Sequence, residues 1–169
     1  MVMRNCFHET EAVPLTPKFL VEANVKWVNW SNANGYDDFD WDDQWVFAVG
    51  GQYALTSKLK LRAGYNYAKN PVNEHDGFNG MQMTSVQGKS LPGYYCETFR
   101  IIGFPAIAEH HLTLGVGYAF TPKFEINLGY MHAFGNTITE SGTDLTGRPV
   151  TLESELSENS LDFWVTWRF

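Results

Sequence analysis

The sequence has few basic residues and only two cysteines, and it lacks any long apolar run. Lys and Arg number 12 against 19 Asp and Glu in 169 residues, so the formal net charge is −7. A nucleic-acid-binding protein needs a basic face for the phosphates, and this balance argues against one. The longest apolar runs, at residues 45–51 and 101–108, fall far short of the roughly 20 residues that a membrane-spanning helix needs.

Two further absences concern chemistry and targeting. Cys6 and Cys96 form no C-x-x-C pair and have no metal-ligand spacing, so we expect no metal and no other cofactor. No apolar segment follows Arg4, so no signal peptide is visible. Disorder is excluded, because aromatic residues make up 15% of the chain and supply apolar surface to bury.

Apolar residues recur at every second position in about six stretches. Successive side chains of a strand point to opposite faces, so each stretch predicts a strand with one apolar and one mixed face. The six stretches are residues 19–27, 45–55, 59–67, 112–120, 124–130 and 161–169.

The connections between these strands differ in length at the two ends. Three share a Thr-(Pro/Ser)-Lys pattern typical of tight turns, at residues 16–18, 56–58 and 121–123. The opposite connections, at about 31–44, 70–109 and 139–158, are long. Short turns at one end and long loops at the other are typical of outer-membrane β-barrels. We therefore predict an all-β fold, part of a transmembrane antiparallel up-and-down β-barrel.

The chemistry of the two faces favours the same interpretation. The minor face carries glycines and scattered charges rather than the dense charge of a water-facing surface. Aromatic residues gather at both strand ends, as expected at the two membrane interfaces. We expect the apolar face to meet lipid and the mixed face to line a lumen. If Phe47, Leu61, Leu114, Ile126 and Val165 instead shared a dry interior, this interpretation would be wrong.

The last predicted strand, ending on Phe169, looks like the C-terminal signal that the bacterial barrel-assembly machinery reads. Six segments carry a further resemblance: Trp27–Ser31, Leu59–Tyr67, Phe104–Ile107, His111–Tyr118, Glu153–Ser157 and Trp167–Phe169. Their order along the chain resembles the FadL/TodX family of outer-membrane transport proteins for hydrophobic compounds.

The resemblance implies a fourteen-stranded barrel in the outer membrane of a Gram-negative bacterium. It implies passive uptake of long-chain fatty acids or other hydrophobic small molecules, and no enzymatic activity. About six strands cannot close a barrel, since single-chain barrels begin at eight. We therefore interpret residues 14–169 as the C-terminal part of such a barrel, and Met1–Val13, which does not alternate, as an irregular segment.

Candidate ligand-binding residues come from the inner face and from the longest loop. A carboxylate substrate could pair with Lys60 or Arg62, although these cations could equally be neutralised within the lumen. Apolar side chains of loop 70–109 could capture a hydrophobic substrate or pack together as a lid. The candidate residues are Lys60, Arg62, Asn66, Glu125, Asn127, Phe99, Ile102 and Phe104.

The remaining expectations concern partners and alternatives. The acidic loop at residues 37–43 lacks the Gly and Glu of a calcium-binding EF-hand and is expected to face lipopolysaccharide. A lipid-modifying enzyme would need Ser and an acid beside a histidine, but His132 falls on the apolar face with no Ser in its strand. The alternatives are an outer-membrane barrel of another family and a soluble lipocalin-like barrel.

Overall fold

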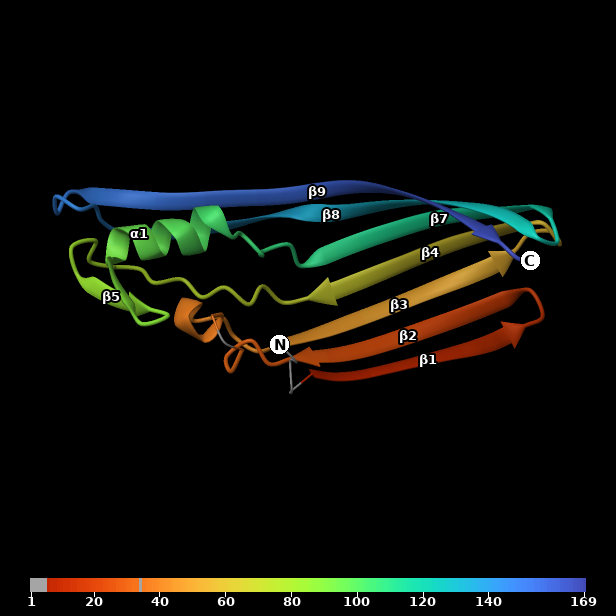
Figure 1. Cartoon of the computed structure of the whole chain (residues 1–169), viewed down its shortest axis with the longest axis horizontal. Coiled ribbons are helices and arrows are strands. Elements are labelled where there is room, and N and C mark those ends of the chain that lie inside the picture. The colour runs from red at the N-terminus through yellow and green to blue at the C-terminus, as the bar shows by residue number, and fades with distance from the viewer. Residues whose placement is uncertain (1–5, 34) are drawn as a thin grey trace.

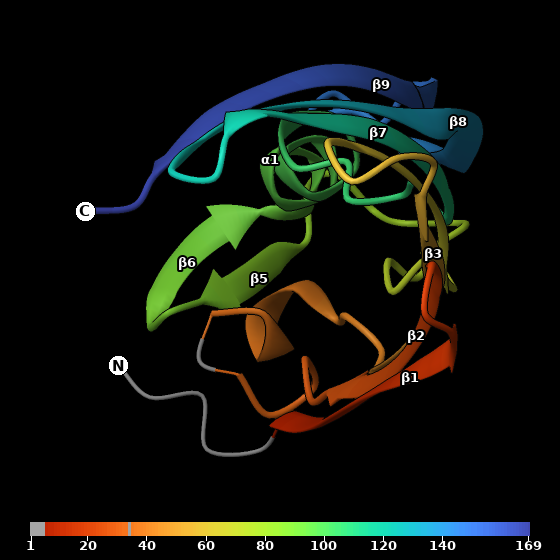
Figure 2. The ribbon, with the colours of Figure 1, turned by 90° about the vertical axis from the view of Figure 1, so that its right-hand side faces the viewer.

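The computed structural model describes residues 6–33 and 35–169. Within these ranges, seven long strands form one antiparallel sheet in the order β1-β2-β3-β4-β7-β8-β9, so β1 and β9 are its edges (Figure 1). The sheet is curved, and an end-on view shows that it has one concave and one convex side (Figure 2). Its strands are β1 (Cys6–Thr16), β2 (Phe19–Val28), β3 (Gln44–Ala54), β4 (Leu59–Ala68), β7 (His110–Thr121), β8 (Phe124–Thr143) and β9 (Pro149–Trp167).

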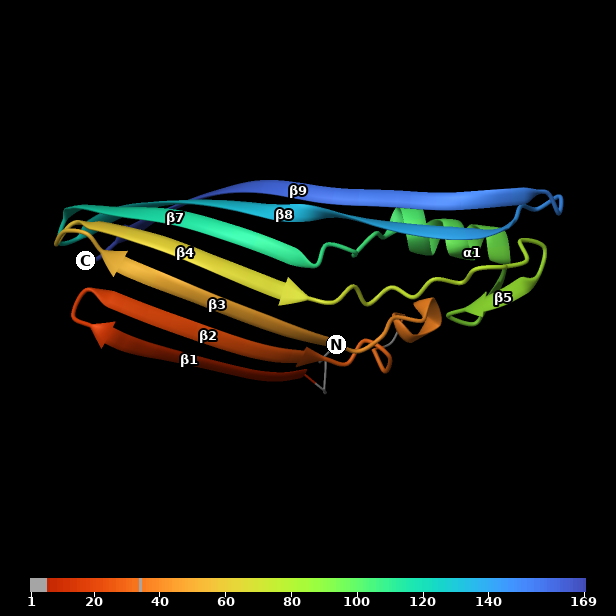
Figure 3. The same ribbon diagram turned by 180° about the vertical axis from the view of Figure 1, so that it is seen from behind.

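The long connections form a cap at one end of the sheet, on its concave side (Figures 2 and 3). Its elements are η1 (Asp37–Phe39), β5 (Met83–Val86), β6 (Lys89–Pro92), α1 (Gly93–Thr98) and the π-helical turn η2 (Phe99–Gly103). The cap has its own apolar core, in which Trp41, Val72, Ile101 and Ile107 pack against Ile138 of β8 and Leu152 of β9. In the part of the chain described here, no helix combines the length and apolar character needed to cross a membrane.

The three short connections are confirmed as tight turns with a shared construction. In each, the Thr hydroxyl oxygen accepts hydrogen bonds from the backbone N–H groups two and three residues further on. Thr16 accepts from Lys18 and Phe19, and the bonds of Thr56 and Thr121 follow the same pattern at 2.9–3.2 Å. The repeated Thr therefore sets the register of three hairpins.

The first strand differs from the expectation for the N-terminus. Of the segment Met1–Val13, expected to be irregular, Cys6–Val13 belongs to β1, and residues 1–5 lie outside the described residues. Strand β1 pairs with β2 from Cys6↔Val28 to Thr16↔Phe19. A strand forms by main-chain hydrogen bonds to its neighbour, whether or not apolar and polar side chains alternate along it. The missing alternation in this segment therefore did not exclude a strand.

The expectation of a long loop at residues 139–158 is also wrong for most of that range. Residues 139–158 continue β8 and β9 outward, and only residues 144–148 connect the two strands. A register shift between Ala133 and Asn136 turns β8 over, so that Ile138 and Glu140 face the cap and are buried. At this bulge the alternation of inward and outward side chains along β8 is interrupted. The sequence pattern therefore did not predict the outer half of the strand.

The faces of β9 exchange their chemistry halfway along the strand. In the outer half, Val150, Leu152 and Leu156 point into the cap, while Glu153 and Glu155 are exposed on the opposite side. Beyond residue 160, Leu161, Phe163, Val165 and Trp167 occupy the exposed side of the same strand. A sheet surrounded only by water would keep one face apolar throughout, so this exchange marks the level where water gives way to hydrocarbon.

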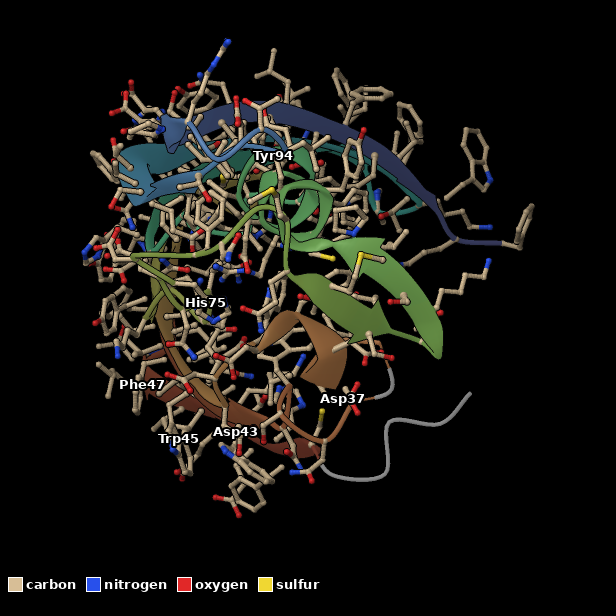
Figure 4. All side chains as sticks on the ribbon, turned by 90° about the vertical axis from the view of Figure 1, so that its left-hand side faces the viewer. Asp37, Asp43, Trp45, Phe47, His75 and Tyr94 are labelled. Atoms are coloured by element: carbon tan, nitrogen blue, oxygen red, sulfur yellow. The ribbon has the colours of Figure 1, made fainter. Side chains whose placement is uncertain are left out.

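The expected apolar outer face is confirmed on the convex side of the sheet. Phe47, Leu61, Leu114 and Val165 are each 43–52% exposed and share no dry interior, and Ile126 is half-buried. Trp45 and Phe47 point away from the concavity (Figure 4). Not every aromatic residue near a strand end lies at the interface, since Trp30 and Trp41 pack edge-on against each other in the cap, with ring centroids 5.5 Å apart.

Candidate functional site

The inner face carries a groove over a row of small residues. Its volume is about 430 Å³, and Gly50 and Gly64 lie directly opposite each other in its floor. Arg62 and Asn66 stand in its wall, together with Glu22 and Asn24 of β2. Because Cβ atoms are absent from the floor, a molecule can approach the backbone closely there.

Four of the candidate residues meet in one ionic cluster beside this groove. Glu125 is 6% exposed, and its carboxylate lies 3.6 Å from Lys60 Nζ, 3.9 Å from Arg62 Nη2 and 3.8 Å from Arg168 Nη2. Arg62 also donates to Asn127 Oδ1 at 2.8 Å. Three cations around one carboxylate leave two positive charges in excess within the cluster. Lys60 and Arg62 are therefore paired, but they are not fully neutralised by Glu125.

Gly117 of β7 makes room for this cluster. A Cβ placed there would overlap Asn127 Oδ1 and come within 3.1 Å of Arg62 Nη1 and 3.3 Å of Glu125 Oε1. Asn66 stands apart from the cluster, where its amide lies 3.4 Å from His111 Nδ1. The inner face therefore brings Lys60, Arg62, Glu125 and Asn127 together and leaves Asn66 at the groove.

The three apolar candidates form part of an exposed patch on the cap. Phe99 is 52%, Ile102 49% and Phe104 51% exposed, and Phe99 packs against Phe39 of η1 with ring centroids 5.7 Å apart. Other large side chains of the same loop are also exposed. These are Met81, Met83, Leu91 and Tyr95. The loop thus packs partly on itself and keeps an apolar surface open.

The carboxylates of the acidic loop mostly organise the loop itself. Asp37 Oδ1 accepts from the N–H groups of Gly35 and Asp38, and Asp43 Oδ1 accepts from the N–H and hydroxyl of Ser31. Asp38 and Asp40 bond other segments, because Asp38 Oδ2 accepts from the Gln87 N–H at 3.1 Å and Asp40 Oδ2 lies 2.9 Å from His75 Nε2. This hydrogen bond from His75 holds the pKa of Asp40 below its usual value.

The cap contains an ionic cluster that sequence reasoning missed. His75, Glu140 and the neighbouring pair Glu97 and Arg100 come from three segments of the chain, and Arg100 and Glu140 are almost completely buried. Burial lowers the pKa of His75, but its hydrogen bonds with Asp40 and Glu97 outweigh that effect and raise the pKa above its ordinary value. No local motif could reveal the cluster, since its members are separated by up to 65 positions.

The structure places His132 on the apolar outer face of the sheet. It pairs with Leu112 on the outer face of β7–β8, as its position in the alternation predicts, and its Nδ1 lies 2.9 Å from Asn159 Oδ1. Its ring packs edge-on against Phe134 with centroids 4.7 Å apart.

Comparisons with known proteins agree with this arrangement. Residues 10–77 match the family model described as outer membrane protein transport protein (OMPP1/FadL/TodX). A 47 kDa outer membrane protein of Pasteurella multocida is 24% identical over 92% of this chain, which covers 32% of that protein. The toluene transporter TodX of Pseudomonas putida aligns with 97% of this chain at 18% identity and a TM-score of 0.60. A FadL homologue of Pseudomonas aeruginosa aligns with 94% at the same identity and TM-score.

The curved antiparallel sheet, its apolar convex face and these matches define the chain as part of a transmembrane β-barrel of the outer membrane. The chain spans about a third of the length of the relatives that it matches. Residues 10–77 resemble the OMPP1/FadL/TodX family, and nearly the whole chain shares the fold of TodX.

Proposed function

We propose that the protein containing this chain carries hydrophobic small molecules passively across the outer membrane. The observation that carries the proposal is the apolar patch of the cap, which lies on the concave side of a sheet whose convex face is built for lipid. An exposed apolar patch of this kind is typical of a binding surface. A substrate would leave water at the cap and then pass along the inner face.

Among hydrophobic molecules, we propose that those with a carboxylate, such as long-chain fatty acids, are preferred. The cluster around Glu125 holds Lys60, Arg62 and Arg168 against a single carboxylate, so a second carboxylate would complete its charge balance. Charge-assisted hydrogen bonds to cations are stronger than neutral ones. The alkyl chain would lie along the glycine-floored groove whose wall contains Arg62.

Two partners follow from the placement of the chain in the outer membrane. We propose that the barrel-assembly machinery binds the exposed terminal segment, where Trp167 at the end of edge strand β9 is 61% exposed and Phe169 beyond it is fully exposed. We also propose that the acidic loop of the cap, whose Asp38, Asp42 and Asp43 are exposed, faces lipopolysaccharide bridged by divalent cations.

Uptake by cells that produce the protein tests this function. A labelled fatty acid and an alkane of equal chain length are compared in cells with the wild type, with Arg62→Gln, and with Arg148→Gln as a control in the outer turn. We expect the wild type to raise uptake of both compounds over cells without the protein. Arg62→Gln should lower fatty-acid uptake about 10-fold, the effect of ~1.4 kcal/mol, and leave alkane uptake unchanged.

Two results would contradict the proposal at different levels. If the wild type raised uptake of neither compound, passive transport would be wrong. If Arg62→Gln reduced both compounds equally, or neither, the role of the cation cluster in recognising a carboxylate would be wrong while transport could stand. Arg148→Gln should behave as the wild type in both assays.

A further inference from the structure

The ionic cluster in the cap brings together a histidine and two carboxylates, which are side chains that can bind a transition metal. One ligand atom from each of His75, Glu97 and Glu140 lies within 4.8 Å of the others. His75 Nδ1 and Glu97 Oε1 are 3.2 Å apart. Ligands at ~2.1 Å from a tetrahedral zinc ion are about 3.4 Å from each other, so small side-chain movements would bring all three onto one ion.

One of these candidate ligands has a buried carboxylate oxygen that forms no hydrogen bond in the described structure. Glu140 is completely buried, and its Oε2 has no hydrogen-bond partner among the described residues. Its other oxygen, Oε1, accepts from the Arg100 guanidinium and from the backbone N–H of His75. A buried carboxylate oxygen without a partner is costly, and coordination of a cation removes that cost.

Hydrogen bonds with Arg100 and Asp40 fix the orientation of the three candidate ligands. Arg100 donates to Glu97 Oε2 at 2.8 Å and to Glu140 Oε1, which leaves the second oxygen of each carboxylate directed elsewhere. His75 Nε2 lies 2.9 Å from Asp40 Oδ2, so that nitrogen can donate while Nδ1 is left to coordinate. A metal-binding histidine almost always donates its second ring N–H to a carboxylate in this way.

The charge of the cluster also fits a divalent cation. Metal ligands bind in their deprotonated forms, so His75 would coordinate as the neutral ring. Asp40, Glu97 and Glu140 then contribute three negative charges against one positive charge on Arg100, and the cluster has a charge of −2. We propose that His75, Glu97 and Glu140 bind one Zn²⁺ ion, with Arg100 and Asp40 as positioning residues. Calcium is a poorer fit, because it prefers six to eight oxygen ligands and rarely uses histidine.

Such an ion would join the separate parts of the cap. His75 lies inside the concavity (Figure 4), Glu97 belongs to α1, Glu140 to β8, and Asp40 follows η1. The metal would therefore fix the connection between β4 and β7 against the outer half of the sheet. This inference does not depend on which substrate the protein carries.

Equilibrium dialysis of Zn²⁺ against the full protein, purified from outer membranes in detergent and freed of metal, tests the site. We expect one Zn²⁺ per chain, not displaced by excess Ca²⁺ or Mg²⁺. His75→Gln should abolish this binding, whereas Asp40→Asn, which removes only the group behind His75, should weaken it roughly 10-fold. The matched control His132→Gln changes a histidine on the outer face and should bind as the wild type.

Folding of each variant is checked by gel electrophoresis, in which the mobility of an unheated sample is compared with that of a heated one. Should His75→Gln fail to fold, Asp40→Asn remains informative, because its side chain is 64% exposed and little packing is lost. The proposal is overturned if the wild type binds no stoichiometric Zn²⁺, if Ca²⁺ displaces it, or if Asp40→Asn and His75→Gln both retain wild-type affinity.

Discussion

At the scale of single residues, the alternation predicted which side chains share the inner face but not how they pair. Lys60, Arg62, Glu125 and Asn127 lie on that face, as their positions in the strands indicate. The part of Arg168 in neutralising Glu125 depends on the register between β8 and β9, which no local pattern records. The cap cluster was missed for a similar reason, since His75 and Glu140 meet only through tertiary packing.

The space at Gly117 should be necessary for the ionic cluster. Gly117→Ala places a Cβ against Asn127 Oδ1 and near Arg62 and Glu125, so we expect it to destabilise the folded protein by ~1–3 kcal/mol, measured by urea unfolding in lipid vesicles. The control is Gly50→Ala, where the nearest atom to the new Cβ is 3.5 Å away. Gly50→Ala should change stability by less than ~0.5 kcal/mol. Equal effects of the two substitutions would show that the cluster needs no such space.

At the scale of elements, regular alternation predicted β2, β3, β4 and β7 within two residues at either end. The outer halves of β8 and β9 were missed, because the apolar residues there change sides as the surroundings change from lipid to water. Strand β1 was missed because Glu9 and Glu11 occupy the side on which its partner β2 has Val25 and Ala23. Carboxylates on a lipid-facing side are unfavourable, which makes β1 the least typical strand of the sheet.

The end of β9 should matter more for assembly into the membrane than for the stability of the folded barrel. Phe169 makes no contribution to a core, being fully exposed, so its loss should cost little stability. Deleting Phe169 should nevertheless lower the amount of folded protein in the outer membrane severalfold, measured by quantitative immunoblotting of membrane fractions. The control Phe120→Ala removes an exposed aromatic residue at the same end of the sheet and should have a smaller effect. Equal yields from the deletion and the wild type would contradict a role for Phe169 as the recognition signal.

At the scale of the whole molecule, the described strands form a curved sheet with two open edges. Neighbouring strands are antiparallel throughout, so β1 and β9, the first and seventh strands of the sheet, run in the same direction. An antiparallel barrel that contains this sheet therefore needs an odd number of further strands, and the fourteen strands implied by the family resemblance would require seven. Unpaired edges are costly in lipid, so both edges need partners in the membrane.

The most direct test of the account is the environment of adjacent residues on β7. Leu114→Cys and Thr113→Cys are each introduced with Cys6 and Cys96 replaced by Ser, labelled with a nitroxide in the full protein, and reconstituted in lipid vesicles. Collision rates with oxygen, which concentrates in hydrocarbon, and with a water-soluble nickel complex are then measured by electron paramagnetic resonance. Leu114 faces the convex side and Thr113 the inner side, so we expect high oxygen accessibility at position 114 and high nickel accessibility at position 113. The reverse pattern would contradict a lipid-facing apolar surface.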